Sequence, residues 1–213
     1  MTVGPAIGPA IGPASKPLSA PANPASNSAA TAADDWAKAQ MLVRAGSNDE
    51  AEPLLRRVVE SQPTAVAPRQ ALVGLLLGSR RFAEAIPVLK VGVQRVPQQT
   101  GWAMNLARLH VDAGDYASAW EALAIGLPHA QQQADYLAFA GTVLQRIDRS
   151  VDAATQYQAA LRLRPEEARW WVGLGIALDA AGHPVDAKTA FRRAKAMGGY
   201  SSEMARYIDQ KLQ

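Results

Sequence analysis

The chain has 213 residues, enough for a domain with a sizeable core, and its 22 Lys and Arg against 19 Asp and Glu give a net charge of +3. This small excess, carried by scattered arginine doublets, argues against the concentrated basic face of a nucleic-acid-binding protein. The absence of cysteine excludes disulfides and thiolate metal sites. No stretch approaches the roughly 18 consecutive apolar residues that a membrane-spanning helix needs.

Residues 1–33 differ in texture from the rest of the chain. Proline, alanine, glycine and serine dominate, and the run Ile7–Ala14 repeats Ile-Gly-Pro-Ala. Such a segment cannot bury enough apolar surface to offset the entropy of ordering it, which predicts a disordered, semi-extended linker. A proline-rich ligand for another domain is the alternative, although the basic flank of many such ligands is missing. The segment contains no basic region followed by an apolar one, so the sequence does not predict a signal peptide.

From Asp34 onward the sequence repeats with a helical pattern. Alanine recurs every 34 residues, at Ala51, Ala85, Ala119, Ala153 and Ala187. Large residues follow four positions later, at Leu55, Leu89, Leu123, Tyr157 and Phe191, and predict a buried stripe. Turns are predicted five positions before each alanine, at Gly46, Arg80, Gly114, Asp148 and Gly182. Two small-residue columns, one of them Val58, Gly92, Gly126, Ala160 and Ala194, predict close approach of helix backbones.

This spacing resembles the tetratricopeptide repeat, a helix pair of 34 residues. The best copy is Trp171, Leu174, Gly175, Leu178, Gly182, Ala187, Phe191 and Ala194. The resemblance implies an all-α, right-handed α-solenoid of about five helix pairs over residues 34–213. The units fall near 32–65, 66–99, 100–133, 134–167 and 168–199.

A closing helix is predicted at residues 201–212. The segment begins with residues that favour a helix N-cap. Met204, Ile208 and Leu212, with Tyr207 alongside, form one apolar stripe. Because an open repeat stack exposes its last apolar face, this helix is expected to cap the solenoid.

Reactive constellations are absent from the sequence. The histidines, His110, His129 and His183, belong to no metal-binding or catalytic pattern, and His110 stands in a column otherwise filled by leucine. The Gly173-x-Gly175 pair lies inside a predicted helix rather than after a strand, which excludes a phosphate-binding loop. We therefore expect a protein without catalytic, cofactor-binding or metal-binding residues.

Partner binding is expected on the concave face of the solenoid. In the tetratricopeptide family the first helix of each pair lines this groove. Trp170, next to Trp171, is added as an aromatic candidate for contact with a partner. The resulting candidates are Gln70, Met104, Arg108, Phe139, Thr142, Arg146, Trp170, Val172, Ile176 and Asp179. They suit an extended or amphipathic peptide with an acidic group for Arg108 or Arg146. Helix packing is the alternative role for Met104, Phe139, Val172 and Ile176. The Lys and Asn that hold a C-terminal carboxylate in some family members are missing.

A narrower resemblance concerns Ala168–His183, which is similar to the C-terminal repeats of the MshN family of MSHA pilus biogenesis proteins. It implies a protein-binding scaffold in the assembly of a type IV-like pilus or secretion machine. In that family a membrane anchor precedes a Pro/Ala-rich linker, so the expected location is the periplasmic side of the inner membrane. A soluble cytoplasmic adaptor unrelated to pili is the alternative.

Overall fold

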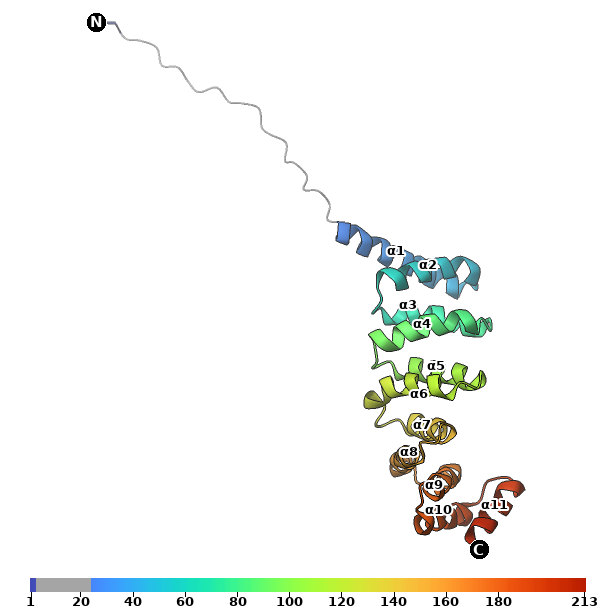
Figure 1. Ribbon diagram of the computed structural model, residues 1–213. Coiled ribbons are helices and arrows are strands. Elements are labelled where there is room, and N and C mark those ends of the chain that lie inside the picture. Colours follow the sequence, from blue (N-terminus) through green and yellow to red (C-terminus); the bar gives the residue numbers. More distant parts are fainter. Residues whose placement is uncertain (3–23) are drawn as a thin grey trace.

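The computed structural model describes residues 1–2 and 24–213, and it describes side chains from Ala29 onward. Within these residues the chain forms antiparallel helix pairs stacked one after another (Figure 1). The helices are α1 (Pro24–Arg44), α2 (Asn48–Ser61), α3 (Val66–Gly78), α4 (Phe82–Arg95), α5 (Thr100–Asp112), α6 (Tyr116–Gly126), η1 (Leu127–His129), α7 (Ala134–Arg146), α8 (Ser150–Leu163), α9 (Ala168–Ala180), α10 (Pro184–Met197) and α11 (Ser202–Leu212). In Figure 1, α1–α6 lie across the view whereas α7–α9 are seen closer to end-on, so the helix direction turns along the stack.

The first helix begins earlier than the composition predicts. We expected the linker to reach residue 33, but α1 already starts at Pro24. Four alanines among residues 29–33 explain the difference, because alanine is the strongest helix former and packing of α1 on α2 then extends the helix. The rest of the predicted linker, residues 3–23, lies outside the described residues.

The predicted turn column is confirmed residue by residue. All five positions adopt a positive φ: Gly46 79°, Arg80 60°, Gly114 78°, Asp148 58° and Gly182 81°. Each residue closes the first helix of its pair in the left-handed conformation. Arginine and aspartate occupy this position in two repeats at some energetic cost, so the repeat geometry outweighs local preference there.

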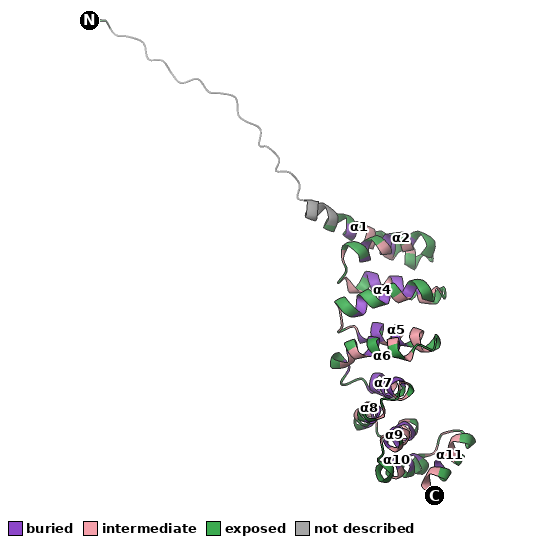
Figure 2. Ribbon diagram, viewed as in Figure 1, coloured by how far each residue is buried: buried purple, intermediate pink, exposed green. Residues whose placement is uncertain are grey.

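The core consists of two clusters that meet at α7. The first runs from Ala39 to Val143, the second from Leu137 to Ile208, and Trp120 and Leu127 pack against both. Figure 2 shows the buried residues along the facing sides of the helices. The 3-10 helix η1 follows the short helix α6 at this boundary, where Pro128 cannot continue an α-helix.

Two glycines of a small-residue column serve a different purpose from the one predicted. A Cβ at Gly92 would lie 2.6 Å from Cδ of Arg69 and 2.8 Å from Cε3 of Trp102. A Cβ at Gly126 would lie 2.5 Å from the hydroxyl of Tyr136. These glycines therefore make room for large side chains of neighbouring helices.

Helix α11 caps the stack as predicted. The Ser201 hydroxyl accepts a hydrogen bond from the Met204 N–H at 3.3 Å, which is the geometry of an N-cap. Ile208 is fully buried, and Met204, Tyr207 and Leu212 pack against the same cluster. The Tyr207 ring meets Phe191 of α10 edge-on, with centroids 6.0 Å apart.

Candidate functional site

The first helices of the third and fourth pairs border an open cavity of about 730 Å³. We call it the α5–α7 cavity. It is lined by Met104 and Arg108 of α5, by Gln132–Tyr136 around the start of α7, and by Leu163 and Arg164 at the end of α8. Two of the predicted groove residues, Met104 and Arg108, thus face one space, and a third lies beside them.

That third residue is Phe139, whose ring lies under the Arg108 guanidinium at 5.9 Å from the centroid. Nη2 of Arg108 also contacts the Met104 sulfur at 3.6 Å. Arg108 is exposed and forms no ion pair with any described carboxylate. A guanidinium with an aromatic face on one side and no acidic partner is available for a carboxylate ligand.

The second arginine of the cavity is already engaged. Arg164 is hydrogen-bonded to Asp135, lies 3.9 Å from Glu167, and covers the Trp170 ring at 4.5 Å from the centroid. Trp170 is therefore half-buried under its own chain rather than free. Arg164 and Asp135 were missed by the sequence analysis because their positions carry no repeating residue type.

A polar network lies beside the groove candidate Thr142. Its hydroxyl is 2.9 Å from that of Tyr157, which donates to Oε1 of Gln145 at 2.9 Å, and Nε2 of Gln145 donates to the Gly173 carbonyl at 2.8 Å. Burial raises the pKa of Tyr157, so its hydroxyl remains a hydrogen-bond donor at neutral pH. This network ties α7, α8 and α9 together and engages the Thr142 hydroxyl.

Several predicted groove residues are unavailable to a partner or lie elsewhere. Val172 is only 4% exposed and packs in the core, which supports the packing role for this residue. Oε1 of Gln70 accepts a hydrogen bond from the Trp102 indole at 2.6 Å. The Arg146 guanidinium lies over the Tyr116 ring at 4.4 Å, at the edge of the stack.

The C-terminal end of the predicted groove is occupied by the capping helix. Nζ of Lys211 donates to Asp179 at 2.6 Å, and Ile176 lines a small cavity with Met204 and Tyr207 of α11. The sequence predicted both the groove candidates and the cap but gave no indication that they would meet. The open part of the groove therefore lies at α5 and α7.

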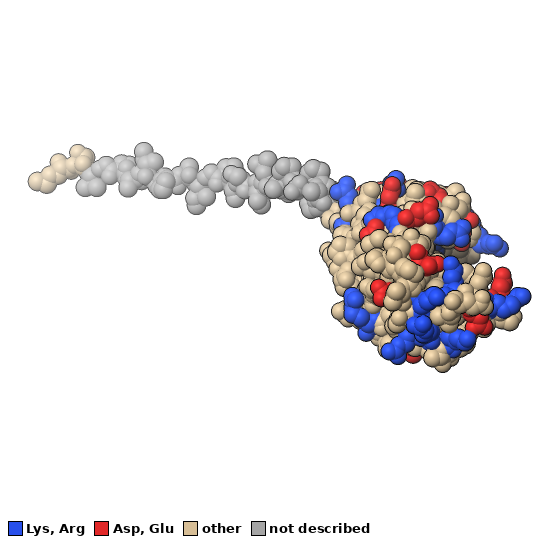
Figure 3. Space-filling model, turned by 60° about the horizontal axis from the view of Figure 1, so that its bottom comes forward, with Lys and Arg blue, Asp and Glu red and all other residues tan. Residues whose placement is uncertain are grey.

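Other chemistries find no support in the described part of the chain. None of its residues form a cluster of His, Asp and Glu suited to a metal ion. None of its helices is long and apolar enough to cross a bilayer. On the face in Figure 3, basic and acidic side chains are mixed in the upper half, and several basic side chains lie together in the lower half.

Several solved structures have a fold similar to that of this chain. The chain is similar to a solved structure of the MamA protein, with 19% identity, a TM-score of 0.60, and coverage of 80% of this chain and 97% of that chain. A MamA from Desulfovibrio magneticus RS-1 gives 17% identity, 78% and 94% coverage, and a TM-score of 0.56. YrrB, described as a TPR protein with an unusual peptide-binding site, gives 13% identity, 81% and 88% coverage, and a TM-score of 0.64. No curated protein matches in sequence.

Family models agree with these structures. One tetratricopeptide-repeat model matches residues 36–100 and 140–202, and a second matches residues 76–141. Together with the solved structures they confirm the predicted all-α solenoid, whose family is generally non-catalytic and binds other proteins. This chain belongs to the tetratricopeptide-repeat family.

Proposed function

We propose that the chain is a non-catalytic scaffold whose α5–α7 cavity binds an acidic peptide segment of a partner protein. The observation that carries this proposal is Arg108, an exposed guanidinium beside Met104 and Phe139 that pairs with no described carboxylate. An acidic side chain on Arg108 and an apolar neighbour against Met104 and the 37% exposed Leu163 would use both features of the cavity. A peptide-binding site in YrrB, which shares the fold, is consistent with this function.

Peptide binding is tested by fluorescence anisotropy on the full chain with labelled Glu/Leu-rich and matched Gln/Leu-rich peptides. The wild type is expected to prefer the acidic peptides, and Arg108→Glu is expected to abolish the preference. Arg192→Glu is the matched control, because Arg192 is exposed on α10, away from the cavity, and forms no ion pair with the described residues. Equal binding of both peptides, or equal effects of the two variants, would overturn the assignment.

The narrower proposal concerns the machine that this scaffold serves. We propose, from the resemblance that the residues Ala168–His183 suggest, a role in assembling a type IV-like pilus or secretion machine. The family models and the solved structures show the repeat fold and name no pilus protein. The proposed location is the periplasmic side of the inner membrane.

Affinity capture from a detergent-solubilised bacterial envelope, followed by mass spectrometry, tests this role. Pilus or secretion-platform proteins should be captured by the wild type and lost with Arg108→Glu. Capture of cytoplasmic proteins alone would instead favour a cytoplasmic adaptor.

A further inference from the structure

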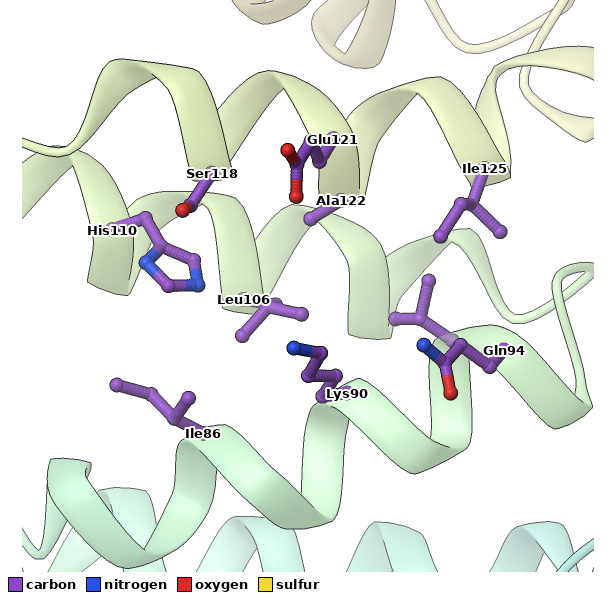
Figure 4. Close-up of a pocket in the computed structure, with 10 residues that line it drawn as sticks. Ile86, Lys90, Gln94, Leu106, His110, Ser118, Glu121, Ala122 and Ile125 are labelled. Atoms are coloured by element: carbon purple, nitrogen blue, oxygen red, sulfur yellow. The ribbon is translucent and has the colours of Figure 1, made fainter.

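A second cavity lies between α4 and α6, the second helices of the second and third pairs. It is bounded by α4 and α6, floored by Leu106 and His110 of α5, and has a volume of about 150 Å³ (Figure 4). Ile86 and Ile125 contribute apolar walls. Nothing in the proposed function uses this space.

The equivalent position one repeat earlier is filled by charged side chains. Glu52, Arg56 and Glu84 stand 34 residues before Ile86, Lys90 and Ser118. Arg81 joins them between α2 and α4, hydrogen-bonded to Glu52 and paired with Glu84 at 2.7 Å, while Arg56 bonds Glu84 at 2.7 Å.

The equivalent position one repeat later is filled by an aromatic ring. Trp120 stands 34 residues after Ile86. The Arg149 guanidinium covers this ring at 5.0 Å from its centroid and is itself paired with Asp152 at 2.6 Å. Between α4 and α6 the position holds Ile86 rather than a tryptophan, and Ser118 stands where the neighbouring repeats have Glu84 and Asp152. His110 stands in place of Leu76 and Leu144. The cavity is therefore a local departure from a position that neighbouring repeats close.

Two opposite charges border the cavity. Figure 4 shows the Lys90 ammonium group on the α4 side and the Glu121 carboxylate on the α6 side, facing one another across it. Both residues are exposed, and neither forms an ion pair with any described residue. A ligand that carries an acidic group toward α4 and a basic group toward α6 would satisfy both.

The volume limits the ligand. Cofactors and metabolite-sized ligands occupy pockets of roughly 300–1,000 Å³. A cavity of about 150 Å³ accommodates a group the size of benzene. This size fits one large apolar side chain, with the flanking main chain lying outside.

We propose that the cavity between α4 and α6 is a second protein-docking site that receives one Leu-, Ile- or Phe-sized side chain of a partner segment. The residue on one flank of this side chain is acidic and bonds Lys90, and the residue on the other flank is basic and bonds Glu121. The site shares no lining residue with the α5–α7 cavity and would let the scaffold hold a second partner.

The probe is the peptide acetyl-Glu-Leu-Lys-amide, titrated to millimolar concentration into the full chain and followed by NMR. The ring signals of His110 and the methyl signals of Ile86 and Ile125 should shift and saturate. His129 and His183 lie outside the cavity and serve as internal references. Acetyl-Glu-Gln-Lys-amide, which lacks the apolar side chain, should leave all these signals unchanged.

Two variants test the space in the cavity and the charges at its border separately. Ile86→Trp copies Trp120 of the next repeat, so it should fill the cavity and abolish binding. Lys90→Glu changes an exposed residue and makes both sides acidic, so it should shift preference toward acetyl-Lys-Leu-Lys-amide by about two- to fivefold, the effect of an exposed ion pair.

Failure of the wild type to respond to acetyl-Glu-Leu-Lys-amide would overturn the docking site. An unchanged peptide preference in the folded Lys90→Glu variant would overturn the role of the charges. Neither result depends on the Arg108 site, which Arg108→Glu tests separately.

Discussion

The stretch from α4 to α7 and the stretch from α7 to α10 use glycine in opposite ways. In the first, glycines on second helices (Gly92 and Gly126) receive Trp102 and Tyr136 from the first helix of the next pair. In the second, glycines on first helices (Gly141, Gly173 and Gly175) receive Tyr157 and Phe191 from second helices. The repeat length is the same in both stretches, but the helix that carries the glycine and the helix that carries the large aromatic side chain are exchanged.

In both stretches, a glycine on one helix makes room for an aromatic side chain of the facing helix. Trp170 occupies the same repeat position as Trp102 and Tyr136. The position that holds Gly92 and Gly126 in the earlier repeats holds Ala160 here. Trp170 is half-buried, with Arg164 over its ring. An inward aromatic at this position thus goes with a glycine in the preceding helix.

The largest expected effect distinguishes the two equivalent tryptophans. Trp102 is 1% exposed, so Trp102→Ala should lower the free energy of unfolding by about 3–5 kcal/mol. Trp170→Ala should cost about half of that or less, because less of its area is buried. Urea unfolding of both variants measures the difference, and equal losses would contradict the comparison.

A smaller effect tests the fit of Gly126 to Tyr136. Gly126→Ala should destabilise by about 1–3 kcal/mol through overpacking, partly offset by the better helix propensity of alanine. Tyr136→Phe alone should cost about 0.5–1.5 kcal/mol, because the hydroxyl donates to the Leu123 carbonyl at 2.7 Å. In the double variant Gly126→Ala/Tyr136→Phe, the missing hydroxyl relieves the clash. The double variant should therefore lose less unfolding free energy than the sum of the losses of the two single variants. Additive losses in chemical unfolding would exclude direct contact.

The most modest effect concerns the charges between α2 and α4. The hydrogen bond from Arg81 lowers the pKa of Glu52 below its ordinary value of 4.5. This carboxylate therefore adds stability above pH 4.5 that is lost as the pH falls through its lower folded pKa.

Glu52→Gln should reduce stability at neutral pH, and its difference from the wild type should shrink under acid. Denaturant unfolding across this pH range tests the effect. Glu60→Gln on the same helix is the control, since Glu60 is exposed and pairs with no described residue. A difference that does not change with pH would contradict this role of Glu52.

The sequence by itself determined the repeat length, the helix pairs, the five turns and the capping helix. Each follows from local periodicity: a 34-residue recurrence, residues at helical spacing, and a stop signal that every unit shares. The resemblance to the tetratricopeptide repeat also placed Met104, Arg108 and Phe139 on the first helices as groove candidates, and their role in binding stays a prediction.

Only the tertiary structure decided how neighbouring repeats fit and which surfaces stay open. Val172 is buried, Asp179 is paired with Lys211, and Arg108 has no acidic partner among the described residues. Whether the space between two second helices is filled depends on several side chains from more than one helix at once, as the Arg81 cluster, Trp120 and the open cavity show. Periodicity describes one helix at a time, whereas packing depends on the sum of volumes and charges contributed by several, and that sum exists only once the helices are stacked.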